Sequence, residues 1–145
     1  MGRFRGAAAV AVVMLVLTGC GGSDEEDVAR VLESYPHALA AGDARAACEA
    51  FSPEAQREQV RRPGGLCAFL RETVSEMTPE QRRRSRATKA VRVEVEADRA
   101  TGYLQYGDCI LTTSESELSR SDSGDWRIES MGGVSTGNET RCLDR

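Results

Sequence analysis

The hydrophobic positions of the chain change their pattern twice. An unbroken apolar run extends from Ala7 to Leu17. Between Val28 and Met77, apolar residues recur at intervals of three and four, the spacing of helices with one buried face. From Ala90 onward they alternate with polar residues, the spacing of strands with one solvated face. This order predicts an apolar N-terminal segment, then helices, then an antiparallel sheet, which is an α+β fold.

The first helix is predicted from residue 28, and its flanking residues mark where it ends. Pro36 interrupts the pattern and predicts a kink. Gly42 is suited to end this helix, while Asp43 and Ser52 are suited to cap two shorter helices that follow. The apolar stripe of the first helix comprises Val28, Val31, Leu32, Tyr35 and Leu39.

Two more helices are predicted before the sheet. The first has a stripe expected to face the core, made of Leu66, Phe69, Leu70, Val74 and Met77. Thr78 and Gln81 form a capping box that begins the second. That helix has no apolar face, and its basic residues are Arg82, Arg83, Arg84 and Arg86. Two alternatives stay open: the arginines are solvated, or they meet anionic lipid or a polyanionic wall polymer.

Four strands are predicted in meander order. In the first, Val91, Val93 and Val95 are expected on one face, alternating with Arg92, Glu94 and Glu96. The others are expected at 100–106, 109–118 and 126–129, separated by turn residues such as the Ser-Asp-Ser-Gly-Asp sequence at 121–125. The result is an antiparallel sheet with one wet face.

The N-terminal segment has the order of an export signal. Arg3 and Arg5 precede the apolar run, and small residues follow it. The run is eleven residues long, so as a helix it would span roughly 16 Å, about half of a hydrocarbon core. A removed signal at residues 1–19 is therefore predicted rather than a transmembrane helix.

The residues that end this signal are Leu17, Thr18, Gly19 and Cys20, and they resemble the lipobox of bacterial lipoproteins. The resemblance implies that Cys20 receives a diacylglyceryl group and that the peptide bond before it is cut. The domain would then sit on the outer face of the cytoplasmic membrane, held by acyl chains such as palmitate. The alternative is an ordinary secreted protein in which Cys20 happens to follow an apolar run.

Residues 20–27 are predicted to form an acidic tether. After Cys20 the sequence is Gly-Gly-Ser-Asp-Glu-Glu-Asp, with four carboxylates and no apolar side chain. We expect a flexible spacer that holds the domain off the membrane. A calcium site is the alternative, but such sites need carboxylates fixed in a folded loop.

The composition excludes few classes of protein, but its charge balance limits the kinds of partner that are expected. Without residues 1–19, Lys+Arg falls from 19 to 17 while Asp+Glu stays at 23, so the net charge changes from -4 to -6. Nothing in this balance indicates a nucleic-acid partner. A domain over residues 28–131 and a polar tail over 132–145 are expected.

Four cysteines remain once Cys20 is lipidated: Cys48, Cys67, Cys109 and Cys142. An even number in an exported chain indicates two disulfides, with three possible connectivities. Proximity in the sequence favours Cys48 with Cys67 and Cys109 with Cys142, the second pair fixing the tail. Metal binding is the alternative, but no CxxC pair supports it, and no metal is predicted.

Two segments, Tyr35 to Cys48 and Ser123 to Ile128, resemble the two ends of small bacterial lipoproteins with an NTF2-like (SnoaL-like or DUF4878-like) domain. The resemblance spans about Val28 to Ile128. It implies a cone in which N-terminal helices pack on a curved antiparallel sheet of about four strands. The family includes isomerases, cyclases and dehydratases as well as many non-catalytic members, and fold alone does not decide between them.

The catalytic members of that family place an aspartate base and tyrosine or histidine donors inside the cone. Tyr103 is the candidate here for lining a pocket, although an aromatic residue in a strand usually only packs. His37 is the one histidine, expected as a surface or capping residue of the first helix.

The sequence holds no Ser-His-Asp set, no glycine-rich phosphate loop and no metal cluster, and so no cofactor is predicted. The leading hypothesis is a non-enzymatic, lipid-anchored domain that binds an envelope protein or a small ligand. An enzyme using the cone and a structural envelope spacer are the alternatives. A cone filled by Trp126, Val93, Phe69 and Leu70 would favour interaction, whereas a carboxyl group facing Tyr103 in a cavity would favour catalysis.

Overall fold

The computed structural model describes residues 23–106, 109–110, 115–132 and 141–142, the last pair and 109–110 as backbone only. Within these ranges the helices are α1 (Asp24–Ala41), α2 (Ala44–Glu49), α3 (Pro53–Glu58), α4 (Gly65–Glu76) and α5 (Pro79–Arg86). The strands are β1 (Lys89–Glu96), β2 (Arg99–Tyr106), β3 (Cys109–Ile110), β4 (Ser116–Arg120), β5 (Trp126–Ser130) and β6 (Arg141–Cys142). No described helix has the length and apolar character needed to cross a membrane.

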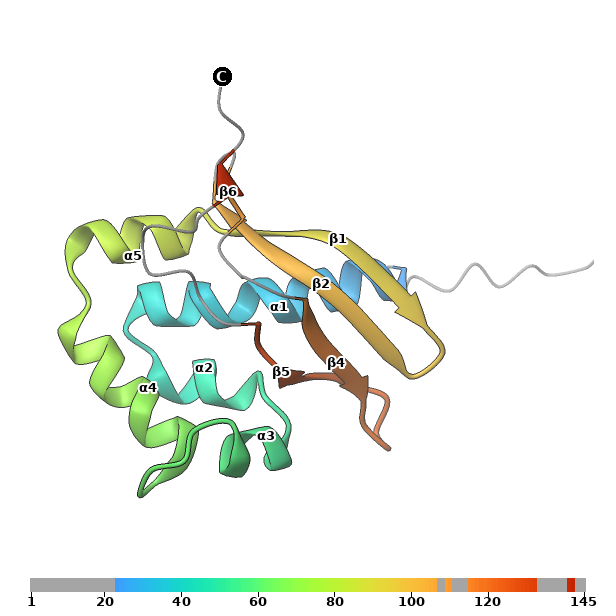
Figure 1. Cartoon of the computed structure of the whole chain (residues 1–145), viewed down its shortest axis with the longest axis horizontal. Helices are drawn as coiled ribbons and strands as arrows, with labels where there is room; N and C mark the ends of the chain where they lie inside the picture. The colour runs from blue at the N-terminus through green and yellow to red at the C-terminus, as the bar shows by residue number, and fades with distance from the viewer. Residues whose placement is uncertain (1–22, 107–108, 111–114, 133–140, 143–145) are drawn as a thin grey trace, which may run out of the picture.

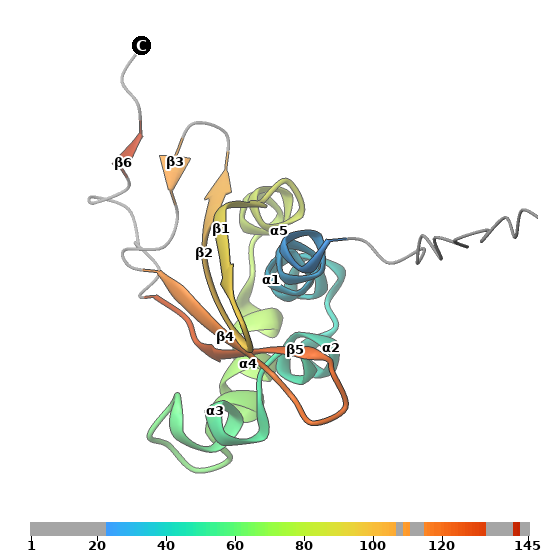
Figure 2. The same cartoon turned by 90° about the vertical axis from the view of Figure 1, so that its right-hand side faces the viewer.

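The helices pack around α1 on one face of an antiparallel sheet, apart from α3, which lies against the edge strand β5, and this confirms the predicted α+β class (Figure 1). β1, β2, β4 and β5 pair in meander order, as expected. α1 crosses the sheet and contacts β1, β2 and β5, with α5 on one side of it and α2 on the other. The sheet is strongly bent, so β4 and β5 run across the end of the layer formed by β1 and β2 (Figure 2).

The predicted third strand is divided in two. β3 pairs with the C-terminal end of β2, where Tyr106 is opposite Cys109. β4 pairs with the N-terminal end of β2, where Ala100 is opposite Leu118. Both strands lie on the same edge of β2. The order of the strands is therefore as predicted, but two short strands replace the one continuous strand that was expected. β3 also pairs with β6, which was not predicted.

A β-bulge in β1 overturns the simple alternation of its three valines. The register shifts between Val91 and Glu94, and Arg92 has φ 52°. Val91 is therefore opposite Tyr103 on the outer face of the sheet, away from the helices. Val93 and Val95 pack against the core as predicted. A bulge places an extra residue in one strand, and a pattern of period two cannot reveal it.

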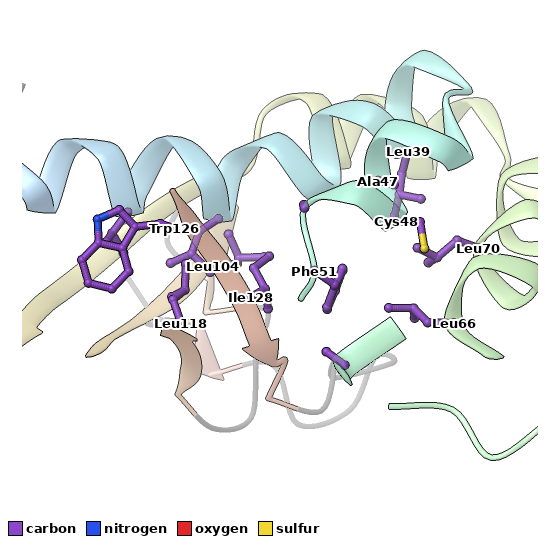
Figure 3. Packing of buried hydrophobic residues seen from close by; sticks show 14 of the residues in the cluster. Leu39, Ala47, Cys48, Phe51, Leu66, Leu70, Leu104, Leu118, Trp126 and Ile128 are labelled. Atoms are coloured by element: carbon purple, nitrogen blue, oxygen red, sulfur yellow. The ribbon is translucent and has the colours of Figure 1, made fainter. Parts of the chain in front are cut away.

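The core lies between α1 and the inner face of the sheet. Gly102 shows how close the two layers come: a Cβ atom there would lie 2.8 Å from Leu32 Cδ1 and 3.3 Å from Val93 Cγ2. Figure 3 shows the strand side chains under α1 and Phe51 between them and α4. The largest buried apolar side chains of this cluster include Leu32, Phe51, Leu70, Leu104, Leu118, Trp126 and Ile128.

α1 begins earlier than predicted, which corrects the tether. Ser23 caps the helix by accepting a hydrogen bond from the Glu26 amide at 3.3 Å, and Asp24 to Asp27 form its first turn. Four acidic residues suit a helix N-terminus because its dipole is positive there, even without an apolar side chain. Residues 24–27 are therefore helical rather than a flexible spacer. The helix continues through a buried Pro36 and ends at Gly42, as predicted, with φ 84°.

The predicted caps of the next helices are present. Asp43 accepts from the Ala46 amide at 2.9 Å, and Ser52 accepts from the Ala55 amide at 3.1 Å. Thr78 and Gln81 form the reciprocal capping box of α5. Local side-chain chemistry therefore sets these helix starts.

α4 corrects one expected core residue and confirms one disulfide. Leu66 and Leu70 are buried, but Phe69 is 39% exposed, with the Arg62 guanidinium 5.7 Å from its ring centre. A disulfide joins Cys48 in α2 to Cys67 in α4, with 5.3 Å between their Cα atoms. The two helices are thus covalently linked beside the core.

Candidate functional site

The predicted lipid-attachment site lies outside the described residues, as do all of Leu17, Thr18, Gly19 and Cys20. The second cysteine pair is described only by its backbone. β3 and β6 pair with Cys109 directly opposite Cys142. The second disulfide remains a prediction, now with a backbone register that is compatible with it.

The space between the helices and the sheet is apolar where the structure describes it. The buried polar side chains are Ser52, Thr88 and Ser116, none of which titrates near neutral pH. Trp126 and Leu70 fill this space together with Val93 at its margin, while Phe69 does not. No carboxyl group is fully buried in the described interior.

Tyr103 is on the outer face of the sheet, which overturns its role as a pocket candidate. Its neighbours Gly102 and Leu104 are the residues of β2 that face α1. The Tyr103 hydroxyl donates to Glu115 Oε1 at 3.3 Å, and the Arg92 guanidinium lies 5.8 Å from its ring centre. Partial desolvation, and then the Glu115 carboxylate, raise the pKa of this phenol. The alternation of side chains along a strand defines two faces, but it does not show which face the helices cover.

His37 has a structural contact. Its Nε2 atom lies 3.1 Å from the Thr88 carbonyl oxygen, joining α1 to the start of β1. In the part of the chain described, no group of three or more potential ligands could hold a metal ion.

A cleft of about 380 Å³ opens between α3 and the sheet, and we call it the α3 cleft. The segment before α3 pairs in parallel with β5: the Ser52 amide donates to the Ile128 carbonyl at 2.9 Å. This pairing brings α3 beside the outer face of β4 and β5. The lining residues are Glu54, Ala55, Glu58, Gln59, Arg99, Ser119 and Glu129.

Glu129 is the most constrained charged residue of the α3 cleft. Ser52 Oγ donates to its Oε2 atom at 2.6 Å, and Ser119 Oγ donates to its Oε1 atom. Both carboxylate oxygens are therefore held by hydroxyl groups from different elements. Ser52 Oγ also accepts a hydrogen bond from the Ala55 amide at 3.1 Å, so the hydroxyl that holds Glu129 is at the same time the cap of α3.

Arg99 lines the same cleft as Glu129. It is directly opposite Ser119 in the pairing of β2 with β4. No salt bridge joins Arg99, Glu54 or Glu58 to another residue in the described ranges. The cleft thus presents a guanidinium and carboxylates that do not neutralise one another. Sequence analysis missed this site because its parts come from three segments distant in the chain.

A second cleft, of about 450 Å³, lies beside the disulfide. Arg45 and Glu49 at its rim form an ion pair at 2.7 Å. Its lining residues are Ala44, Arg45, Cys48, Glu49, Gln56, Cys67 and Arg71. Since Arg45 and Glu49 pair with each other and Arg71 donates to the Cys67 carbonyl at 3.3 Å, this cleft offers fewer free charged groups than the α3 cleft.

Arg82 in α5 also has a role that its sequence context did not reveal. It is the half-buried arginine of α5, and its guanidinium donates to the Val74 carbonyl at 2.7 Å. It also lies 3.4 Å from the Leu39 carbonyl oxygen and 3.5 Å from that of Ala40. It therefore joins the C-terminal ends of α1 and α4, where a positive charge is favoured by the helix dipole.

The end of α1 nearest to Cys20 is fixed by Arg120. This side chain pairs with Asp24 at 2.6 Å and lies 4.0 Å from Asp98 in the turn between β1 and β2. Its guanidinium stacks 4.6 Å from the ring centre of Trp126. The first turn of α1 is therefore held against both β-hairpins.

A layer of helices on a bent antiparallel sheet is the arrangement found in folds of the NTF2-like, or cystatin-like, class. A particular solved structure of this class is similar to the chain: an NTF2-like protein with a cystatin-like fold from Novosphingobium aromaticivorans. The TM-score is 0.50 at 17% identity, over 80% of this chain and 84% of that one. The likeness confirms the predicted fold and carries nothing on activity. No family model and no curated protein matches the chain.

Proposed function

We propose that this chain is a lipid-anchored domain on the extracytoplasmic face of the cell membrane that binds a ligand or protein partner without catalysing a reaction. The observation that carries the proposal is the apolar interior: the described part of the cone is filled by side chains such as Leu104 and Ile128, and its fully buried polar residues, Ser52, Thr88 and Ser116, include no carboxyl group and no histidine. An NTF2-like fold whose interior is filled by apolar side chains is suited to binding a partner or ligand at its exterior.

The lipobox supports the anchor, and the cysteines support the compartment. Thr18, Gly19 and Cys20 follow an apolar run, ending at Leu17, that is too short to span a bilayer. The disulfide between Cys48 and Cys67 is typical of a protein exported to an oxidising compartment.

The α3 cleft is the site we propose for a small ligand. Its guanidinium, Arg99, would pair with a carboxylate or phosphate. Its carboxylates, Glu54 and Glu58, would pair with an ammonium group. The chemical class that matches both is a zwitterion, such as an amino acid or a short peptide with free ends.

The anchor is tested by Cys20→Ala in the native host. We expect radioactive palmitate to label the wild-type chain and not the variant, because the thiol is the acceptor of the lipid. Detergent-phase partitioning should be lost with the label. Gly22→Ala is the matched control and should remain labelled. A wild-type chain that takes up no label would refute the anchor.

The α3 cleft is tested by thermal unfolding with amino acids and dipeptides as probes. A ligand that binds only the folded state raises the unfolding temperature. We expect a rise with the wild type and none with Arg99→Gln. Arg45→Gln, at the rim of the other cleft, is the control and should respond like the wild type. Equal responses of the two variants would exclude the α3 cleft as the site.

A further inference from the structure

α5 and the residue that begins β1 carry a concentration of positive charge in an otherwise acidic protein. Residues 79–89 contain five basic side chains and one acidic one, Glu80. The chain without residues 1–19 has 17 basic and 23 acidic residues, a net charge of -6. The basic side chains are Arg82, Arg83, Arg84, Arg86 and Lys89.

Only part of this charge is needed for the fold. Arg82 is half-buried and joins α1 to α4. The arginines at 83, 84 and 86 are exposed, and α5 buries no residue at all. Arg83 pairs with Glu80, and Arg84 stacks 5.5 Å from the ring centre of Tyr106. Arg86 makes no salt bridge with a described residue. We call Arg83, Arg84 and Arg86 the α5 arginine face.

Lys89 extends the α5 arginine face toward β1. Its Nζ atom lies 3.9 Å from Glu33 Oε2, and its side chain is 69% exposed. Glu33 is less exposed and also accepts from the Ala90 amide. The pair of Arg83 with Glu80 is exposed on both sides, and such pairs are weak because water screens them and the side chains lose freedom. The Arg83 guanidinium therefore stays available to a multivalent anion.

The opposite end of α1 is acidic. Asp24 to Asp27 begin the helix, and the turns at 97–98 and 121–125 lie at the same end (Figure 1). Arg120 fixes this end by its contacts with Asp24 and Asp98. α5 lies at the other end, where Arg82 reaches the carbonyls of Leu39 and Ala40. The two charges are thus segregated along an 18-residue helix, a length of roughly 27 Å.

We propose that the α5 arginine face binds a phosphate-bearing polymer of the cell envelope, on the side of the domain away from the membrane. The inference rests on the proposed anchor at Cys20. Because Cys20 lies three residues before Ser23, the acidic end is within about 10 Å of the lipid. The α5 arginine face lies at the other end of α1, roughly 27 Å away, which is beyond the Debye length of about 8 to 10 Å over which anionic headgroups attract guanidinium groups.

Phosphate is the anion that this surface fits best. Guanidinium groups bind phosphate oxygens with two parallel hydrogen bonds, and arginine retains its charge at any physiological pH. Several such groups on one short helix suit a repeating anion, since each bound phosphate adds a contact and releases counterions.

The test uses the chain from residue 20 onward with Cys20→Ser, which keeps every described residue and needs no membrane. The probes are long-chain inorganic polyphosphate and vesicles of phosphatidylglycerol, with phosphatidylcholine vesicles as the neutral reference. The test variant is Arg83→Gln/Arg84→Gln/Arg86→Gln. The control, Arg45→Gln/Arg57→Gln/Arg71→Gln, has the same net charge and changes exposed arginines of α2, α3 and α4.

We expect wild-type binding to polyphosphate that weakens with salt. The α5 variant should lose about tenfold in affinity and about two units of the slope of log K against log salt, and the control less than about threefold. Arg86→Glu alone should weaken binding in the same direction without disturbing Glu80 or Tyr106, and circular dichroism should show both α5 variants folded.

Three results would overturn the inference: no binding of polyphosphate, equal losses in the two triple variants, or tighter binding to phosphatidylglycerol vesicles than to polyphosphate. The last would identify a membrane-facing surface instead. None of them bears on lipid attachment, which the palmitate label reports separately.

Discussion

Tyr35 lies where α1 meets the segment before α3, and its environment affects the ionisation of its phenol. Its ring makes an edge-to-face contact with Phe51, with 5.3 Å between ring centres. Burial raises the pKa of Tyr35 above its ordinary value of 10.0. The neutral phenol is therefore favoured in the folded state.

This shift predicts how stability changes in alkali. Above about pH 10 the unfolded chain loses the Tyr35 proton while the folded chain keeps it, so the free energy of unfolding falls. The contribution is present in full below the unfolded pKa and is lost as the pH rises toward the raised folded value, by up to about 1.4 kcal/mol per pH unit. Tyr35→Phe should decline less steeply in urea titrations between pH 9.5 and about 11. An identical decline would contradict the assignment to Tyr35.

Gly102 is a second residue whose surroundings explain its identity. A side chain at this point would have to displace Leu32, because a Cβ atom would lie 2.8 Å from Leu32 Cδ1. The close approach of the two layers leaves little room for an interior ligand at this point. Function at the exterior is consistent with this local geometry.

Among the elements, α5 is held to the fold by one side chain more than by an apolar face. Arg82 donates to the ends of α1 and α4, whereas its neighbour Arg83 pairs only with Glu80 on the same helix. Loss of Arg82 leaves partly buried carbonyls without their charged donor.

We therefore predict that Arg82→Ala lowers the free energy of unfolding by about 1 to 3 kcal/mol. Arg83→Ala should change it by less than about 0.5 kcal/mol. The two changes are matched in helix propensity, because each replaces an arginine of α5 by alanine. Urea unfolding measures both, and equal effects would show that Arg82 does not join the helices.

Element boundaries were predictable where one side chain decides them. Asp43, Ser52 and the pair Thr78 and Gln81 cap their helices as the sequence indicates, because a cap is a contact between near neighbours. The start of α1 was missed because an acidic first turn has no apolar residue to reveal it. In the sequence, only the cap residue Ser23 and the acidic side chains that follow it mark that turn.

Long-range features were not predictable from the pattern. The bulge at Arg92 and the division of the third strand depend on how β2 pairs with its neighbours. The α3 cleft joins residues 54, 99 and 129, and no local signal links them. Tyr103 was a candidate for lining a pocket because the alternation of a strand gives two faces without showing which one the helices cover.

At the scale of the whole molecule, the disulfide between Cys48 and Cys67 restricts the unfolded chain. It closes a loop with a sequence separation of 19 between α2 and α4. In the chain-entropy model such a loop contributes about 3 kcal/mol, a large share of the roughly 5 to 15 kcal/mol of a small domain.

Cys48→Ala/Cys67→Ala should therefore lose about 3 kcal/mol in urea unfolding without reductant. The double variant also isolates the second pair. If Cys109 and Cys142 are joined, as the pairing of β3 with β6 allows, reductant should destabilise the variant further. A variant indifferent to reductant would exclude that second link.

The early start of α1 has a consequence for how long the domain would stay on its cell. Only Gly21 and Gly22 separate Cys20 from the helix cap Ser23. Extracellular proteases cut exposed, extended backbone. The ion pair between Arg120 and Asp24 helps to keep the residues after Ser23 helical. Shedding into the medium would require that first turn to unwind, so a lipidated chain of this design should be retained on the cell throughout growth.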